Sequence, residues 1–162
     1  MNSDFYSDSF CFLSFDKDNP EHVAALEKLV SDPLVDEYFT SLEAHLENDS
    51  SFWDSAFLVS NYVDIIGYLA VFMDAKVAEL HYAVVPEFRG IRNNSNETVG
   101  CQIVREASTS LFSRCKSLKY LKLMIEKSNI RSTKAALRAG YKQVSKGKFN
   151  EFNLKREDAM RF

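Results

Sequence analysis

The sequence predicts one α/β (α+β) domain, built on a mixed, mostly antiparallel, six- to seven-stranded sheet with helices on both faces. Two observations support this prediction. Three apolar, strand-like runs follow one another across tight turns, as in an antiparallel meander. A strand, helix, strand unit then follows, which adds parallel pairing to the sheet. A chain of 162 residues is long enough to bury roughly two thirds of its unfolded surface around one core.

The composition narrows the class of protein. Hydrophobic residues make up 46% of the chain and aromatic residues 13%, which excludes a disordered chain. A net charge of −3 provides no general positive field, so we expect neither nucleic acid nor membrane as a partner. Cys11, Cys101 and Cys115 are too widely spaced for a metal site or a disulfide framework, which favours a reduced, cytoplasmic protein. The N-terminus lacks the basic and apolar regions of a signal peptide.

The first third of the chain predicts a strand and two helices. Residues 1–9 are polar and predict a flexible tail, and the apolar run at residues 10–15 predicts the first strand. Asn19 as N-cap and Pro20 at the first helical position predict a helix start. After an interruption at residues 31–33, helical spacing resumes at Val35, Tyr38, Phe39, Leu42 and Leu46.

The remaining elements follow from the same periodicities. The three strands of the meander are predicted at residues 56–59, 65–72 and 77–85. From Thr98 an apolar stripe predicts a helix, and alternation predicts a strand at residues 118–125. The chain then continues with a helix at 132–139 that ends at Gly140, and with strands at 141–144 and 149–154.

Two stretches resemble a known family. The first, AELHYAVVPEFRG at residues 78–90, is similar to the strand-4 signature of the ribosomal-protein alanine acetyltransferases within the GNAT superfamily of N-acetyltransferases. The second, NIRSTKAALRAGY at residues 129–141, resembles another GNAT signature, with Asn129, Ser132, Gly140 and Tyr141 in place. The predicted element order matches the family over nearly the whole chain, which implies a GNAT-like acyl-CoA N-acyltransferase fold.

The resemblance implies acetyl-CoA as cosubstrate, bound where two central strands of the sheet part. In this family a bulge frees backbone groups, here near Val84 and Val85, to pair with the pantetheine amides. Asn129 and Ser132 would contact the pantetheine arm or the adjoining backbone. The pyrophosphate would lie on the loop and helix start, which contain Arg89, Gly90, Thr98, Val99, Gly100 and Cys101.

The loop departs from the family pattern. Arg92 and Asn94 stand where the family has glycines, and Gly100 serves as the last glycine only if about six residues have been inserted. In one interpretation residues 92–97 are an insertion, and residues 98–101 still form the phosphate cradle. In the other, the cradle is damaged and the cofactor binds weakly or not at all. We favour the first, because the following helix keeps its apolar stripe.

The resemblance also suggests catalytic residues. Glu79 is the first candidate for the general base, directly or through water, and His81 on the same strand face is the alternate. The alternative interpretation is that Glu79 is an edge or surface carboxylate and His81 a packed or solvated histidine. Ala136 stands where many relatives have a tyrosine that protonates the thiolate, so that proton would come from solvent or another group. Cys101 and Tyr141 are expected to be packing residues.

The sequence therefore predicts an acetyl-CoA-dependent N-acetyltransferase without a metal, acting as a monomer or homodimer. The acceptor would be a peptide N-terminus or a small-molecule amine. The alternative is a catalytically impaired GNAT-fold protein that binds or regulates.

An aromatic acceptor pocket would involve Tyr38, Phe39 and Trp53. Three lysines predict a solvated face or a contact with the nucleotide 3′-phosphate, namely Lys116, Lys119 and Lys122.

Overall fold

The computed structural model describes residues 3–33 and 56–161. The helices and strands in these ranges are, in chain order, β1 (Phe5–Tyr6), β2 (Cys11–Ser14), α1 (Pro20–Val30), β3 (Ala56–Ser60), β4 (Ile65–Asp74), β5 (Val77–Val84), the 3-10 helix η2 (Pro86–Phe88), α4 (Val99–Arg114), β6 (Tyr120–Glu126), α5 (Ile130–Arg138), β7 (Lys142–Ser145), β8 (Phe149–Lys155) and α6 (Arg156–Ala159). The predicted second helix and the aromatic pocket lie outside the described residues.

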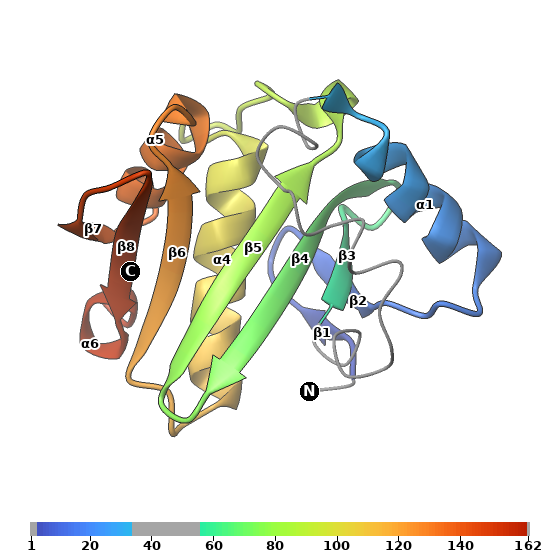
Figure 1. Cartoon of the computed structure of the whole chain (residues 1–162). Helices are drawn as coiled ribbons and strands as arrows, with labels where there is room; N and C mark the ends of the chain where they lie inside the picture. The colour runs from blue at the N-terminus through green and yellow to red at the C-terminus, as the bar shows by residue number, and fades with distance from the viewer. Residues whose placement is uncertain (1–2, 34–55, 162) are drawn as a thin grey trace. The chain divides into compact units, whose positions relative to one another are not determined.

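The strands form one eight-stranded sheet in the order β1-β2-β3-β4-β5-β6-β8-β7 (Figure 1). β5 and β6 pair in parallel, whereas β1 with β2, β2 with β3, β3 with β4, β6 with β8 and β7 with β8 pair antiparallel. The predicted fold class is confirmed, and the sheet has one strand more than the upper limit of the prediction.

The additional strand is β1, which lies in the segment predicted to be a flexible tail. Phe5 is 2% exposed, and its ring stacks on Phe12 with centroids 4.3 Å apart. It also meets the edge of the Phe57 ring at 5.0 Å. The tail prediction is therefore wrong for this part of the segment, because two residues are too few to show a strand period and the pairing with β2 is decided by tertiary packing.

The described chain divides into two compact units that share β4 and β5. The first contains the described residues up to 70 together with Tyr82–Arg89. In it, Leu26 and Leu29 of α1 are fully buried. Asn19 caps α1 by accepting a hydrogen bond from the Glu21 N–H, as the sequence predicts. Beyond the end of α1, Asp32 forms an ion pair with Arg89.

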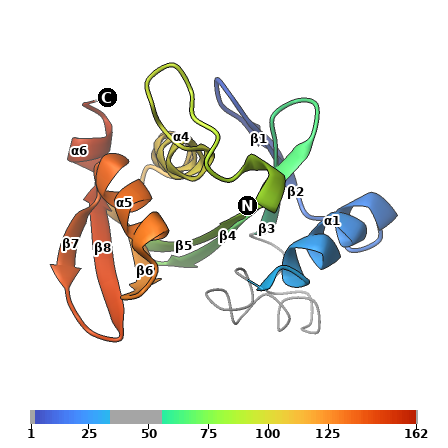
Figure 2. The same ribbon diagram turned by 90° about the horizontal axis from the view of Figure 1, so that it is seen from above.

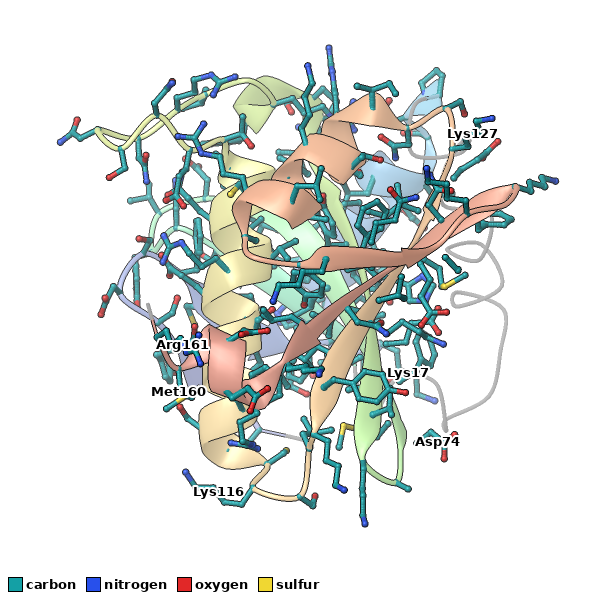
Figure 3. The ribbon with its side chains drawn as sticks, turned by 90° about the vertical axis from the view of Figure 1, so that its left-hand side faces the viewer. Lys17, Asp74, Lys116, Lys127, Met160 and Arg161 are labelled. Carbon is teal, nitrogen blue, oxygen red and sulfur yellow. The ribbon has the colours of Figure 1, made fainter. Side chains whose placement is uncertain are left out.

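The second unit contains Val71–His81 and Gly90–Phe162. Asp74, at the end of β4, and Lys127, just after β6, mark its opposite ends (Figure 3). Helix α4 packs against α5 and α6. The core of this unit alternates along β6 and β8 and follows one stripe of α4, with buried residues Ile103, Val104, Ala107, Leu111, Phe112, Leu121, Leu123, Ile125, Phe152 and Leu154.

Helix α6 was not predicted, yet its first residue completes the end of α4. The Arg156 guanidinium donates to the carbonyls of Leu118, Phe112 and Cys115 at 2.8, 2.6 and 2.5 Å. It also lies over the Phe112 ring, 5.0 Å from its centroid. A cation at this place satisfies carbonyls that a helix C-terminus leaves unpaired.

In residues 3–33 and 56–161, no helix has the length and apolar character needed to cross a bilayer.

Candidate active site

The pairing between β5 and β6 is short. Three pairs are described, from Val77 with Tyr120 to Glu79 with Lys122. Both strands nevertheless continue, β5 to Val84 and β6 to Glu126. A ladder that ends while its strands go on leaves backbone donors and acceptors available for another partner. Glu79 and Lys122 stand at this end of the ladder.

Three charged or titratable side chains contact one another in a row at the end of the β5–β6 ladder, in the order His81, Glu79, Lys122. His81 Nε2 is 2.9 Å from Glu79 Oε1, and Lys122 Nζ is 2.8 Å from Glu79 Oε2. The exposed fractions of these side chains are 25% for Glu79 and 28% for both His81 and Lys122. The His81 ring also meets the Phe72 ring edge-on, with centroids 5.2 Å apart. One carboxylate thus binds an imidazole with one oxygen and an ammonium with the other.

This environment keeps Glu79 ionised. The hydrogen bond with His81 and then that with Lys122 lower the pKa of Glu79 to about 2, although partial burial opposes the change. The hydrogen bond with Glu79 raises the pKa of Lys122 in turn. Because an ionised carboxylate can only accept hydrogen bonds, His81 Nε2 must carry the proton toward Glu79. In a neutral His81, the lone pair is therefore on Nδ1.

The burial pattern of β5 changes phase beyond this cluster. Ala78 and Leu80 are buried, and the next buried residues are Ala83 and Val85, so the alternation slips by one residue. One extra residue in a strand produces such a slip, as in a β-bulge. The burial pattern thus places an irregularity of β5 between Leu80 and Ala83.

The two valines after the slip already have protein partners. The Val84 carbonyl accepts a hydrogen bond from Arg89 Nε at 2.9 Å, and the Val85 N–H donates to the Ile66 carbonyl at 2.9 Å. The expectation that these groups lose their partners is wrong for the Val85 N–H, because it pairs with β4. Arg89 is also engaged, since its guanidinium forms the ion pair with the buried Asp32.

The residues between Gly90 and Thr98 form a compact hairpin. Asn93 organises it: its side-chain oxygen accepts from the N–H groups of Ser95 at 3.0 Å and Glu97 at 2.9 Å. Arg92 pairs with Thr98 in an isolated bridge. The segment lies at the N-terminal end of α4, which Figure 2 views along its axis. Residues 92–97 thus form hydrogen bonds with one another beside the capped start of α4.

Side chains from two helices fix this hairpin in place. Glu97 accepts from Arg105 Nε at 3.0 Å and from Arg105 Nη2 at 2.9 Å. Arg138 of α5 donates to the Ser95 carbonyl at 3.0 Å. The hairpin, the start of α4 and the carboxyl end of β6 lie at one end of the second unit (Figure 1). This is the end at which sheets with parallel strand, helix, strand units bind ligands.

The predicted phosphate cradle is a capped helix start. Thr98 is the N-cap of α4, and its hydroxyl accepts from the Cys101 N–H at 3.3 Å. The Val99 N–H donates to the Ile91 carbonyl at 3.2 Å. Of the three N–H groups at residues 99–101 in the first turn of α4, those of Val99 and Cys101 therefore have acceptors. No acceptor is described for the third, the Gly100 N–H. Gly90, with φ +78, has open space around its Cα, so a ligand can approach the backbone there.

The second family signature also caps a helix. Asn129 is the N-cap of α5, and its side chain accepts from the Ser132 N–H at 3.1 Å. Both residues are half-buried at the start of this helix. The structure thus brings Asn129 and Ser132 together, and the motif has a local structural role whether or not it also contacts a ligand.

Three further candidates are packing residues. Burial raises the pKa of the Cys101 thiol to about 11, so it is not a nucleophile. Tyr141 is 2% exposed, and its hydroxyl pairs with Ser108 Oγ at 2.8 Å. Ala136 is fully buried. The sequence interpretation of Cys101 and Tyr141 as core residues is confirmed.

Sequence reasoning missed two parts of the site. Lys122 was assigned to a lysine cluster on a solvated face, and the pairing with Glu79 depends on the β5–β6 register. The role of Asn93 has a local signal, because an asparagine in a polar loop commonly accepts from N–H groups two residues on.

Among the described residues, no three His, Cys, Asp or Glu side chains are grouped so that they could hold a metal.

Comparison with known proteins defines the fold class. Neither protein-family models nor curated protein sequences match this chain. Solved structures do: the chain has the fold of the GNAT acetyltransferases.

Three of these structures illustrate the likeness. An acetyltransferase of the GNAT family from Bacillus anthracis has a TM-score of 0.72 and 11% identity, over 95% of this chain and 99% of that one. Spermidine N-acetyltransferase from Vibrio cholerae, in complex with CoA and spermine, has the same TM-score of 0.72, identity of 11% and coverages of 95% and 99%. N-acetyltransferase PseH from Campylobacter jejuni, in complex with acetyl coenzyme A, has a TM-score of 0.64 and 20% identity, over 90% and 98%. At these identities the likeness concerns the fold.

Proposed function

We propose that this protein is an acetyl-CoA-dependent N-acetyltransferase that transfers an acetyl group to a primary amine by direct attack on the thioester. The observation that carries the proposal is the carboxylate–imidazole pair of Glu79 and His81 at the residue where the β5–β6 ladder ends. The fold supports it, because a neighbour with this fold binds acetyl coenzyme A.

The attacking amine must be neutral, so its proton needs an acceptor. A peptide α-amine has a pKa of about 7.7–8.0 and a lysine amine one of about 10.4. A carboxylate with a pKa of about 2, as in Glu79, takes such a proton poorly. Histidine exchanges protons near neutral pH. We therefore assign proton acceptance to His81 Nδ1, directly or through water, and assign Glu79 the role of orienting the ring, which reverses the order favoured by the sequence.

For the cosubstrate, we propose that the start of α4 binds the pyrophosphate. The Gly100 N–H and the positive end of the helix dipole supply the attraction, with Thr98, Val99 and Cys101 shaping the turn. Gly90 allows close approach of the backbone, and Arg89 fixes the loop that precedes it.

We propose contacts with the pantetheine arm for Val84 and Val85 on β5 and, separately, for Asn129 and Ser132 at the start of α5. Because Ala136 has no hydroxyl, the proton for the departing thiolate comes from solvent or from another group.

Two acceptor classes fit the proposal. The neighbour that binds spermine supports a small-molecule amine. The similarity of residues 78–90 to the ribosomal-protein alanine acetyltransferases supports a peptide N-terminus. We further propose a cytoplasmic monomer or homodimer, since buried thiols such as Cys101 suit a reducing compartment.

One observation favours a second candidate, a GNAT-fold protein that binds or regulates without turnover. Val99 and Cys101 use their N–H groups inside the protein, so the first turn of α4 offers fewer donors to a pyrophosphate than an open glycine loop. In this case acetyl-CoA would bind weakly and no amine would be acetylated.

The proposal is tested by mixing the protein with acetyl-CoA and single amines in a buffer free of primary amines. The amines are spermidine and a peptide with N-terminal alanine, and thiol release and the mass of the product are measured. We expect acetylated product with at least one amine, and loss of turnover by at least about a hundredfold in His81→Gln. His22→Gln is the matched control and should keep full activity.

A thermal shift experiment separates binding from turnover. Acetyl-CoA at about 100 times its dissociation constant should add about 2.7 kcal/mol to the stability. Binding without turnover of any amine supports the second candidate. No binding at millimolar acetyl-CoA contradicts both the cosubstrate and the enzymatic proposal.

A further inference from the structure

Lys122 has no role in the proposed acetyl transfer, yet it contacts the carboxylate that holds His81. Lys122 and Glu79 are partners in the last pair of the β5–β6 ladder, so the backbone holds their side chains on one face of the sheet. The ammonium binds one oxygen of the Glu79 carboxylate while His81 binds the other. All three side chains are about three-quarters buried, so solvent screens their mutual interactions less than at a free surface.

A carboxylate beside an imidazole by itself favours the protonated ring, because the negative charge attracts the proton. A general base must instead be neutral when the amine arrives. A positive charge on the other oxygen offsets that attraction. The geometry therefore contains both the group that orients His81 and the group that compensates its charge.

We infer that Lys122 is a positioning residue of this site, an ammonium that shares the Glu79 carboxylate with His81 and so offsets the attraction of that carboxylate for a second proton on the imidazole. The inference deepens the proposed function and rests on it for the role of His81. It concerns the charge of the ring and can be measured without acetyl-CoA.

Other charged and titratable groups near the pair lie on β8, β6 and β4. On β8, Glu151 accepts from Asn153 Nδ2 at 3.1 Å, and Asn153 is the ladder partner of Lys122 on that side. On β6, Tyr120 is the neighbour of Lys122 on the same face, and Glu126 lies on that face two positions further along, beyond Met124. On β4, Phe72 contacts His81, and Asp74 lies at the exposed end of the strand. Lys122 is the cation with a described contact to the carboxylate that holds His81.

The experiment follows the His81 imidazole by NMR during a pH titration of the ligand-free protein. The sequence has three histidines, so His81→Gln identifies the signal. In Lys122→Met we expect the midpoint of the His81 titration to rise by about one pH unit, since an adjacent unit charge has been removed. Lys122→Arg keeps the charge and should keep the midpoint within a few tenths of the wild-type value.

A double variant guards against a general loss of structure. In Glu79→Gln/Lys122→Met both charges are absent, and the midpoint should return toward the wild-type value. If the fold were simply disturbed, the double variant would be at least as perturbed as the single one. A midpoint in Lys122→Met that equals or falls below the wild-type midpoint overturns the inference, as does one that the double variant does not reverse.

The kinetic readout distinguishes this inference from the proposed function. In an active enzyme, kcat/KM of Lys122→Met should fall by up to about tenfold on the acidic limb of its pH profile and recover on the alkaline plateau. An equal loss at all pH values contradicts a charge-compensating role. If no amine is acetylated, the NMR result still decides whether Lys122 sets the charge of His81.

Discussion

At the scale of single residues, the site depends on how one carboxylate divides its two oxygens. Glu79 holds His81 in one tautomer and is itself held by Lys122. The same contacts that make Glu79 a weak proton acceptor make it a good orienting group, because an oxygen that stays ionised keeps its hydrogen bond at every pH near neutrality.

The lowered pKa of Glu79 predicts a pH dependence of stability. Because its folded pKa of about 2 lies below the ordinary value of 4.5, the stabilisation is complete above pH 5 and is lost as the pH falls toward 2. Partial exposure reduces the full effect to about 2 kcal/mol. Urea unfolding at pH 6 and pH 2.5 should show a smaller decline for Glu79→Gln than for the wild type. Glu27→Gln, at an exposed position of α1, should lose as much unfolding free energy between the two pH values as the wild type does. An equal loss in all three proteins would refute the lowered pKa of Glu79.

Tyr141 gives a second prediction at this scale. Its hydroxyl bonds Ser108 inside the core, so Tyr141→Phe should cost about 1 kcal/mol of unfolding free energy. Acetyl transfer at saturating substrate should remain within about twofold of the wild type. A loss of turnover of more than about tenfold, with the fold intact by circular dichroism, would instead give this tyrosine a catalytic role.

At the scale of elements, both ends of α4 are completed by groups from outside the helix. Thr98 and the Ile91 carbonyl satisfy its start, and Arg156 satisfies its end. A helix whose terminal groups are paired in this way holds its first turn in a fixed place. A proposed anion site at that turn needs such a fixed position.

The hairpin before α4 yields a prediction about cofactor binding. Asn93→Ala removes the acceptor for two N–H groups and should loosen the hairpin, because no other described side chain in it bonds two backbone groups. We expect the dissociation constant of acetyl-CoA to rise about five- to tenfold, measured by calorimetry. Asn94→Ala in the same hairpin is the control and should bind as the wild type does. An unchanged affinity in Asn93→Ala would separate the hairpin from the cofactor site.

The other end of α4 yields a prediction about stability. Arg156→Met leaves three carbonyls without their donor and should lower the free energy of unfolding by about 2–4 kcal/mol. Arg161→Met, just beyond α6, should cost less than about 0.5 kcal/mol. Equilibrium unfolding in urea measures both. Similar values for the two variants would show that the Arg156 contacts contribute little.

At the scale of the whole molecule, the two compact units share two continuous strands. β4 and β5 each run from one unit into the other. The prediction of a single domain, which follows from chain length, therefore has a measurable consequence.

Calorimetry should show one heat absorption peak in which the van't Hoff and calorimetric enthalpies agree. For 162 residues the enthalpy near 60 °C should be about 110 kcal/mol. Acetyl-CoA should move the whole peak upward. Two separate peaks, with one insensitive to acetyl-CoA, would show that the units unfold independently.

The amino-acid sequence by itself determined the type and order of most elements. Asn19 and Pro20 mark the start of α1, and the alternation of Leu121, Leu123 and Ile125 marks β6, because such signals arise between residues close in the chain. The family resemblance directed attention to Glu79 and His81 in the same way, through a short motif.

The tertiary structure decided what depends on contacts between distant residues. Strand β1 exists because Phe5 packs on Phe12 and Phe57, and α4 ends as it does because Arg156 reaches back to it. Lys122 meets Glu79 because the parallel register sets them opposite each other. A one-residue slip would turn every side chain to the other face, and no local pattern in the sequence specifies that register.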